Sequence, residues 1–110
     1  AGHDEDAEII RKIKSIKVLD LESCTASVKE RFSKKVNRLS LKGYDELMRV
    51  NDEGEKVRVL MKTKKETIRE LLFVCTGKED CTLVQINGKF TKEDIDKLVN
   101  QETKKKHGRR

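Results

Sequence analysis

Hydrophobic residues in this chain change their spacing along the sequence, and these changes predict its helices and strands. Between Asp4 and Lys14, three isoleucines (Ile9, Ile10 and Ile13) have helical spacing, with acidic residues before them and basic residues after them. That order of charges suits a helix dipole, so we expect a first helix here. Residues 15–22 then alternate between apolar and polar positions, which predicts a first strand.

A second helix is predicted over residues 27–42. Ser27 and Glu30 have the spacing of a capping box, and Gly43 stands where the helix should end. The apolar stripe of this helix consists of Val28, Phe32, Val36 and Leu39. Its other face is basic and carries Arg31, Lys34, Lys35, Arg38 and Lys42.

After Gly43 the hydrophobic period falls to two, which is typical of strands. Four strands are predicted in close succession, at residues 44–50, 56–62, 67–75 and 81–87, with turns at 51–54 and 76–80. The connections are too short for parallel crossovers, so the strands should form an antiparallel meander. The run Leu71–Cys75 is almost entirely apolar, which places the third of these strands in the centre of the sheet.

The last predicted element is a short helix that begins at Thr91, after Gly88 has ended the preceding strand. Thr91 and Asp94 resemble a capping box, while Phe90 and Ile95 have the spacing of a hydrophobic staple. We therefore expect an α+β fold: one antiparallel-rich sheet of about five strands, with two to three helices packed mainly on one face. Three segments are expected: an acidic flexible N-terminus (1–8), a single domain (9–101) and a disordered polybasic tail (102–110).

Composition narrows the range of functions without selecting one. Charged residues make up 42% of the chain and the formal net charge is +6, which favours anionic partners. No stretch approaches the roughly 18 consecutive apolar residues of a membrane span, so no transmembrane segment is predicted.

The residues needed for catalysis are not brought together by any recognisable pattern. Both histidines, His3 and His107, lie near the ends of the chain, so no ordered Ser–His or Cys–His pair is expected. Four carboxylates that could serve in catalysis lie at the start of a predicted strand and in a turn, where solvated acidic residues are common: Asp45, Glu46, Asp52 and Glu53. The glycines at 54, 77 and 88 are isolated and form no phosphate loop. We predict no catalytic residue, no metal site and no cofactor, and hence not an enzyme.

The three cysteines permit one structural hypothesis. Cys75 and Cys81 flank a five-residue turn, so a regular hairpin would place them directly opposite each other and within reach of a disulfide in an oxidising compartment. The favoured alternative is that both are small apolar side chains with free thiols. The spacing of Cys24, Cys75 and Cys81 does not favour a metal site.

The basic face of helix 27–42 is a candidate anion-binding surface. Lysines and arginines that recur on one side of a helix can follow a phosphate backbone. However, aromatic residues total only 4%, and nucleic-acid-binding modules usually add aromatic platforms. The ordinary interpretation of such a face is the solvated side of an amphipathic helix, so nucleic acid ranks below a protein as the partner.

Residues 9–99 resemble a family of short, uncharacterised proteins from Bacteroides-type bacteria, known as a domain of unknown function. The segments that carry the resemblance are IKSIKVLDLE, GYDELMRV, EKVRVLMK, TIRELLFV and TLVQINGKFTKEDIDKLV. The resemblance implies an exported precursor that acts in the periplasm or cell envelope, as a periplasmic protein or a lipoprotein. It supplies no catalytic or binding residues.

Two functional hypotheses follow. The first is a non-enzymatic envelope domain for protein binding or signalling, which contacts an unknown protein through the outer face of its sheet or an edge strand. Leu60 is expected to be exposed on that face. The alternative is a nucleic-acid- or anion-binding module that uses helix 27–42. The oligomeric state is left open.

Overall fold

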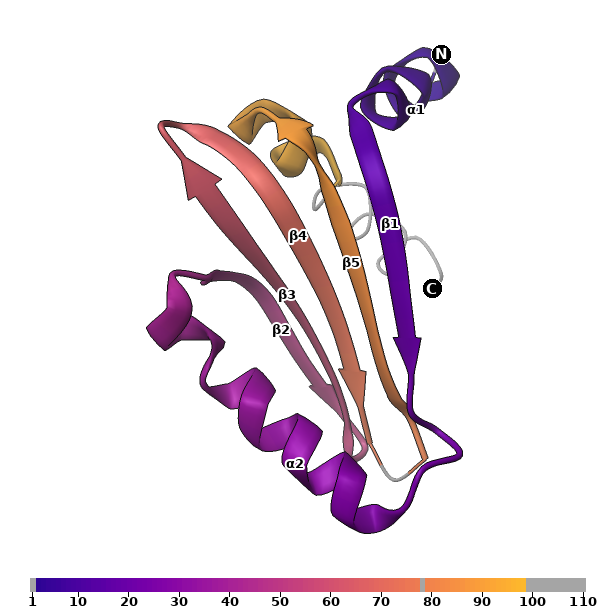
Figure 1. Cartoon of the computed structure of the whole chain (residues 1–110). Coiled ribbons are helices and arrows are strands. Elements are labelled where there is room, and N and C mark those ends of the chain that lie inside the picture. Colours follow the sequence, from indigo (N-terminus) through magenta and orange to yellow (C-terminus); the bar gives the residue numbers. More distant parts are fainter. Residues whose placement is uncertain (1, 78, 99–110) are drawn as a thin grey trace.

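The structure of the chain is a computed structural model that describes residues 2–77 and 79–98. It contains five strands and several helices (Figure 1). Two helices bracket the first strand, a 3₁₀ helix follows, four strands come in succession, and residues 92–98 are helical. In chain order the bounds are α1 Gly2–Arg11, β1 Ile13–Asp20, α2 Ala26–Asn37, η1 Leu39–Lys42, β2 Asp45–Asp52, β3 Glu55–Lys64, β4 Thr67–Thr76 and β5 Cys81–Phe90.

The five strands form one antiparallel sheet with the order β1-β5-β4-β3-β2. Strands β2 to β5 are a meander joined by short turns, and α2 carries the chain from β1 at one edge to β2 at the other (Figure 1). The predicted α+β class and antiparallel sheet are confirmed. The central position of β4, predicted from its continuous apolar run, is confirmed as well.

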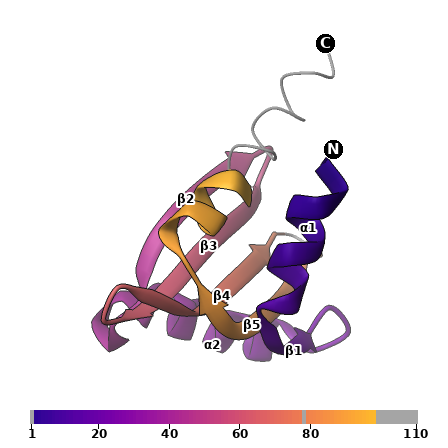
Figure 2. The same ribbon diagram turned by 90° about the horizontal axis from the view of Figure 1, so that it is seen from above.

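Apolar side chains are buried on both faces of the sheet, because neighbouring residues of a strand point to opposite sides. Leu72 and Leu60 belong to a cluster with Val36 of α2. Leu71 belongs to a second cluster, with residues from α1, β5 and the helical segment 92–98. Figure 2 shows α2 and the segment 92–98 on opposite sides of the strands. The helices are therefore divided between the two faces, and the expectation that they pack mainly on one face is wrong.

Leu60 is the clearest consequence of this arrangement. It was expected to be exposed on an outer face, but it has 0% exposure beneath α2. Its β3 neighbour Val59 is also buried, although it points to the other side. The alternating pattern of β3 therefore does not correspond to one solvent-exposed face and one buried face.

The boundaries of the N-terminal helices differ from the predicted ones. Residues 2–8, expected to be a flexible segment outside the domain, belong to α1. In α2 the N-cap is Thr25, whose Oγ1 accepts a hydrogen bond from the Val28 backbone N–H at 3.3 Å. The predicted capping box at Ser27 is wrong because Ser27 already lies inside the helix. Gly43, with a φ of +90°, ends η1 in the left-handed conformation, at the position where the helix was predicted to end. The tail 102–110 lies outside the described residues.

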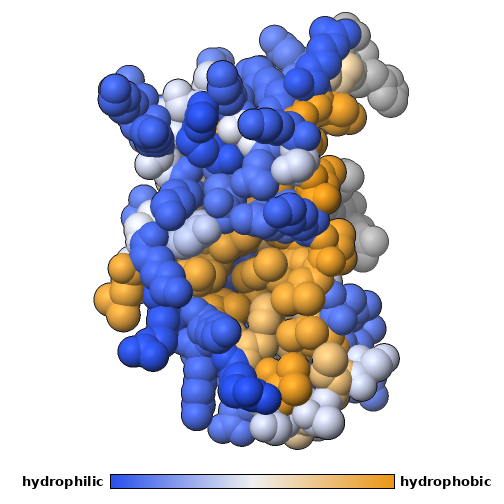
Figure 3. All heavy atoms as spheres, viewed as in Figure 1, coloured by the Kyte–Doolittle hydropathy of each residue, from blue (hydrophilic) through white to orange (hydrophobic). Residues whose placement is uncertain are grey.

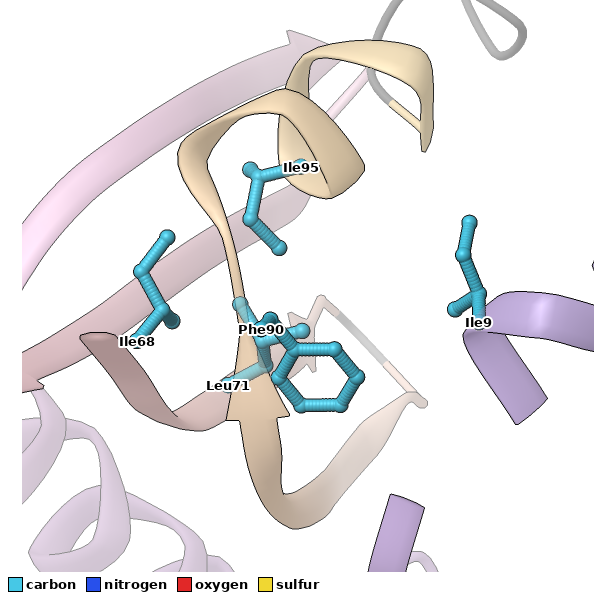
Figure 4. Packing of buried hydrophobic residues seen from close by; sticks show 5 residues of the cluster. All are labelled: Ile9, Ile68, Leu71, Phe90 and Ile95. Atoms are coloured by element: carbon cyan, nitrogen blue, oxygen red, sulfur yellow. The ribbon is translucent and has the colours of Figure 1, made fainter. Parts of the chain in front are cut away.

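The N-terminal cap of the last helical segment, residues 92–98, is as predicted. The Thr91 backbone N–H donates to Asp94 Oδ2 at 2.9 Å, and the Asp94 N–H donates to Thr91 Oγ1 at 3.1 Å. Phe90 and Ile95 are both buried in the cluster shown in Figure 4. This cap starts the segment 92–98 directly after β5.

Gly88 does not end β5 as expected; the strand continues to Phe90. The glycine is required by a close approach of the α1–β1 junction instead. A Cβ at Gly88 would overlap the Lys12 carbonyl oxygen and lie 2.9 Å from two ring atoms of Phe90. That carbonyl accepts a hydrogen bond from the Lys89 N–H at 3.2 Å. The Lys12 side chain then reaches Asp94 Oδ2 at 2.6 Å. Lys12 therefore links the α1–β1 junction to β5 and to the N-terminal cap of the segment 92–98.

Replacing Gly88 with alanine should destabilise the protein. The backbone of Lys12 has to move to admit the methyl group, and we expect a loss of about 3 kcal/mol in the free energy of unfolding. Urea unfolding followed by circular dichroism measures this loss.

Gly77→Ala is the matched control for that variant. A Cβ at Gly77 would meet Glu55 Cγ at 3.2 Å, and a flexible side chain can move away. Its effect should stay within about 1 kcal/mol. Equal effects of the two substitutions would contradict the assigned role of Gly88.

Candidate binding surfaces

The carboxylates considered for catalysis make ordinary surface interactions. Glu46 Oε1 accepts hydrogen bonds from Arg49 Nε at 2.9 Å and Arg58 Nε at 2.7 Å. These two arginines hold the pKa of Glu46 below its usual value. Asp45, Asp52 and Glu53 are exposed. The arrangement stabilises an ionised Glu46 and gives no acid–base pair at this position.

Within residues 2–77 and 79–98, no three histidine, cysteine or acidic side chains are grouped so that they could hold a metal ion. In the same part of the chain, no helix has the length and hydropathy needed to cross a membrane.

The sheet register separates the two cysteines that were expected to face each other. Cys75 pairs with Thr82 and Cys81 pairs with Thr76, so the two cysteines are offset by one residue and point to opposite faces. The expectation that they are directly opposite is wrong. Cys24, Cys75 and Cys81 are all free thiols in the structure.

The three thiols should differ in reactivity because they differ in burial. Cys24 is exposed, Cys75 is half-buried, and Cys81 has 2% exposure. Burial raises the pKa of the Cys75 and Cys81 thiols, which lowers the fraction of reactive thiolate. In native alkylation followed by mass spectrometry, we expect Cys24 to react first and Cys81 at least about tenfold more slowly. Similar rates at all three sites would contradict this order.

The predicted basic face is exposed to solvent along its whole length. Arg31, Lys34 and Lys35 lie on α2, while Arg38 and Lys42 follow it at η1. Lys34 Nζ lies 3.7 Å from Glu30 Oε1, a solvent-screened pair within the helix. The helix predicted to carry all five bases over residues 27–42 therefore ends at Asn37, and its last two bases lie beyond it.

The free edge of β1 carries exposed apolar side chains. Of the described large hydrophobic residues that are exposed, three lie on this strand: Ile16 (55%), Val18 (65%) and Leu19 (45%). Ile16 pairs with Ile86 and Val18 with Val84, so both point to the face opposite α2. Among the described residues, β1 pairs only with β5, which leaves its other side unpaired.

An apolar groove adjoins this strand on the same face. It has a volume of about 390 Å³, and its walls are α1 and the segment 92–98. In Figure 4, Ile95 lies above Phe90 and Ile9 of α1 lies to its right. The groove residues include Ile9, Ile10, Ile13, Phe73, Phe90 and Leu98. Together with Ile16 and Val18, these residues extend the apolar surface of the face opposite α2 past the part that α1 and the segment 92–98 cover.

The α2 side of the sheet is polar at one end. Figure 3 shows hydrophilic residues over the end near α1, and hydrophobic residues between them and α2. A row of polar residues crosses the strands there: the Tyr44 hydroxyl donates to Glu70 Oε2, and Asn87 Nδ2 donates to Ser15 Oγ at 3.1 Å. Lys62 Nζ lies 5.0 Å from the centre of the Tyr44 ring. This row borders a basic groove at the α1–β1 junction.

Tyr44 belongs to this polar row and is the only tyrosine in the chain, so the titration of its hydroxyl reports directly on the row. Burial, followed by the hydrogen bond to Glu70, raises the pKa of Tyr44 to about 12. Its protonated form is therefore favoured by folding: this contribution to stability is complete below about pH 10 and is lost as the pH rises through about 12.

Titration of the phenolate absorbance should give a midpoint near 12 in the folded protein and near 10 in urea. Glu70→Gln should lower the folded midpoint without bringing it fully to the unfolded value, since burial remains. A folded midpoint equal to that in urea would contradict the contact.

Sequence patterns missed both the β1 edge and the basic groove. The alternation of residues 15–22 predicts a strand but not its place in the sheet. The groove brings together residues from the α1–β1 junction, β4 and β5, and no spacing in the sequence signals that meeting.

Comparison with known proteins identifies one family. Residues 2–98 match the family model described as Domain of unknown function (DUF4252). Neither a curated protein nor a solved structure matches the chain.

Proposed function

We propose that this chain, which belongs to the DUF4252 family, is a non-enzymatic cell-envelope domain that binds another protein through the free edge of β1. One observation carries the proposal: Ile16 and Val18 are 55% and 65% exposed on a strand whose outer edge pairs with no other described strand. An unpaired edge with apolar side chains is a template for another strand. Such edges are usually covered or interrupted by charge.

The opposite edge of the sheet has that protection. Both edge strands have a register shift, β1 between Ile13 and Ser15 and β2 between Glu46 and Met48, but on β2 Glu46 also forms ion pairs with Arg49 and Arg58. Charged residues and bulges of this kind discourage edge pairing. The edges differ in the ion pairs of β2 and in the exposed apolar side chains of β1, and this difference favours β1 as the docking strand.

The side chains of β1 indicate the chemistry of the partner segment. Ile16 and Val18 would pack against apolar residues on one face of an added strand. Lys17 points to the other face and is exposed, as is Lys14 nearby. A segment that alternates apolar with acidic residues fits both faces, so we propose an extended protein segment of that pattern as the occupant.

The proposed location rests on what the resemblance of residues 9–99 implies, which is an exported precursor that acts in the periplasm or cell envelope. Fractionation of the source cell tests it: the full-length protein should be recovered in the periplasmic or membrane fraction. Recovery in the cytosol alone would refute the envelope location.

The binding edge is tested by placing a photo-crosslinking amino acid at Val18 in the source cell. Leu41, which is 79% exposed on η1, is the matched control position. A protein crosslinked at Val18 but not at Leu41 would be identified by mass spectrometry and purified for calorimetry. In that assay, Ile16→Asp with Val18→Asp should weaken binding by about 100-fold, because both apolar anchors are replaced by charge.

Leu41→Asp should leave the affinity for the purified partner unchanged. Circular dichroism must first show that both variants are folded, which we expect because the replaced side chains are largely exposed. Equal affinity of the β1 variant and the native chain would refute the proposed edge.

The second candidate function is nucleic-acid binding by the basic face of α2. The observation that favours it is the exposure of all five bases on that side. It predicts an affinity that falls steeply with salt and is lost when Lys34, Lys35 and Arg38 are neutralised together. Absent or salt-insensitive binding to DNA and RNA would exclude it.

A further inference from the structure

The basic groove at the α1–β1 junction lies on the polar end of the sheet, and the proposed strand docking does not use it. Its volume is about 780 Å³. Five of its lining residues are basic, and they come from three separate parts of the chain: Arg11, Lys12, Lys14, Arg69 and Lys89. Among the described residues of its lining, Glu70 is the single acidic one.

The fold gathers these bases through two irregularities. Arg69 lies where the β4–β5 register shifts between Ile68 and Glu70, a place where a side chain is redirected. Lys89 follows Gly88, whose missing Cβ admits the Lys12 backbone. The close approach at Gly88 therefore brings the α1–β1 junction and β5 to the same groove.

Lys12 differs from the other four bases because its charge is already compensated. Its ammonium group lies 2.6 Å from Asp94 Oδ2, and the charges of Glu8 and Glu93 also act on it. Arg11, Lys14, Arg69 and Lys89 are exposed and form no ion pair with any described residue.

The neutral groups beside these four bases suit an oxyanion. Ser15 Oγ accepts a hydrogen bond from Asn87, so its own hydroxyl proton is available to another acceptor. The Glu70 carboxylate is half-buried and accepts the Tyr44 hydroxyl at the border of the groove. The groove thus presents four uncompensated cations and a hydroxyl donor against one engaged carboxylate.

We propose that this groove binds a phosphate group carried by a small molecule or a lipid headgroup. A dianionic phosphate has several acceptor oxygens, and the guanidinium groups of Arg11 and Arg69 can each donate two parallel hydrogen bonds to them. Bound phosphate would also relieve the mutual repulsion of the four cations. A monovalent anion would compensate less of this charge.

The test is a titration of the full chain with inorganic pyrophosphate, followed by two-dimensional amide NMR. The amides of Ser15, Gly88 and Lys89 should shift together and give one dissociation constant. Chloride at the same ionic strength should not reproduce the shifts. No change at these amides would overturn the proposal.

Two matched double variants distinguish binding of pyrophosphate in the groove from its non-specific attraction to positive charge. Arg69→Gln with Lys89→Gln removes two positive charges from the groove, and Arg31→Gln with Lys35→Gln removes two from α2. The groove variant should weaken pyrophosphate binding by about tenfold or more, while the α2 variant should change it by less than about twofold. Equal weakening by both variants would overturn the proposal.

Vesicles distinguish the two sources of phosphate. Phosphatidylcholine vesicles with added phosphatidic acid should bind the native chain but not the groove variant if the natural ligand is a headgroup. If pyrophosphate binds and the vesicles do not, the groove takes a soluble phosphorylated molecule. Both results support a phosphate site, and vesicle binding that the groove variant retains would count against it.

Discussion

The close approach of the Lys12 backbone to Gly88 organises one half of the molecule. At this point the α1–β1 junction crosses β5, and its carbonyl accepts the Lys89 N–H. The Lys12 side chain continues to Asp94, which is 8% exposed and caps the segment 92–98. Burial raises the pKa of Asp94, but hydrogen bonds from Lys12 and Thr91 outweigh that effect and hold its pKa below the usual value. An ionised Asp94 is therefore part of the folded structure, and it fixes the two short helices that flank the apolar groove.

The second constraint is that the sheet has apolar residues on both faces, while the part of the chain that the structure describes supplies only one long helix to cover them. Helix α2 buries Leu60, Leu72 and Val74 completely or almost so. On the other face, α1 and the segment 92–98 cover one end, and Ile16 and Val18 of β1 remain more than half exposed. Burying apolar surface contributes roughly 25 cal/mol per Å², so covering these two side chains would stabilise a complex. The fold thus leaves exposed apolar side chains on the sheet edge formed by β1.

Local patterns in the sequence predicted the elements well but could not predict how distant elements meet. The cap at Thr91, the turn at Gly43 and the central position of β4 depend on neighbouring residues or on a continuous apolar run. Gly88 was interpreted as a strand end because its real reason, the Lys12 carbonyl, lies 76 positions earlier in the chain.

Register was the other source of error. Thr76 remains in β4 and pairs with Cys81, so the hairpin is offset by one residue, which sends Cys75 to the opposite face. Leu60 looked solvent-facing because Val59 and Met61 alternate with it, and only the position of α2 across the sheet shows that both sides of β3 are covered. The basic residues of the groove are brought together by the long-range contact between Lys12 and Gly88, and no spacing of basic residues in the sequence predicts it.

The central claim is that β1 is the edge to which a partner strand is added. Amide hydrogen exchange of the chain, alone and bound to the protein crosslinked at Val18, tests this claim most directly. An added strand takes up the unpaired backbone groups of β1, so residues 13–20 should become strongly protected while residues 45–52 of β2 remain unchanged. Protection confined to β2 or α2, with β1 exchanging as in the free chain, would contradict the account.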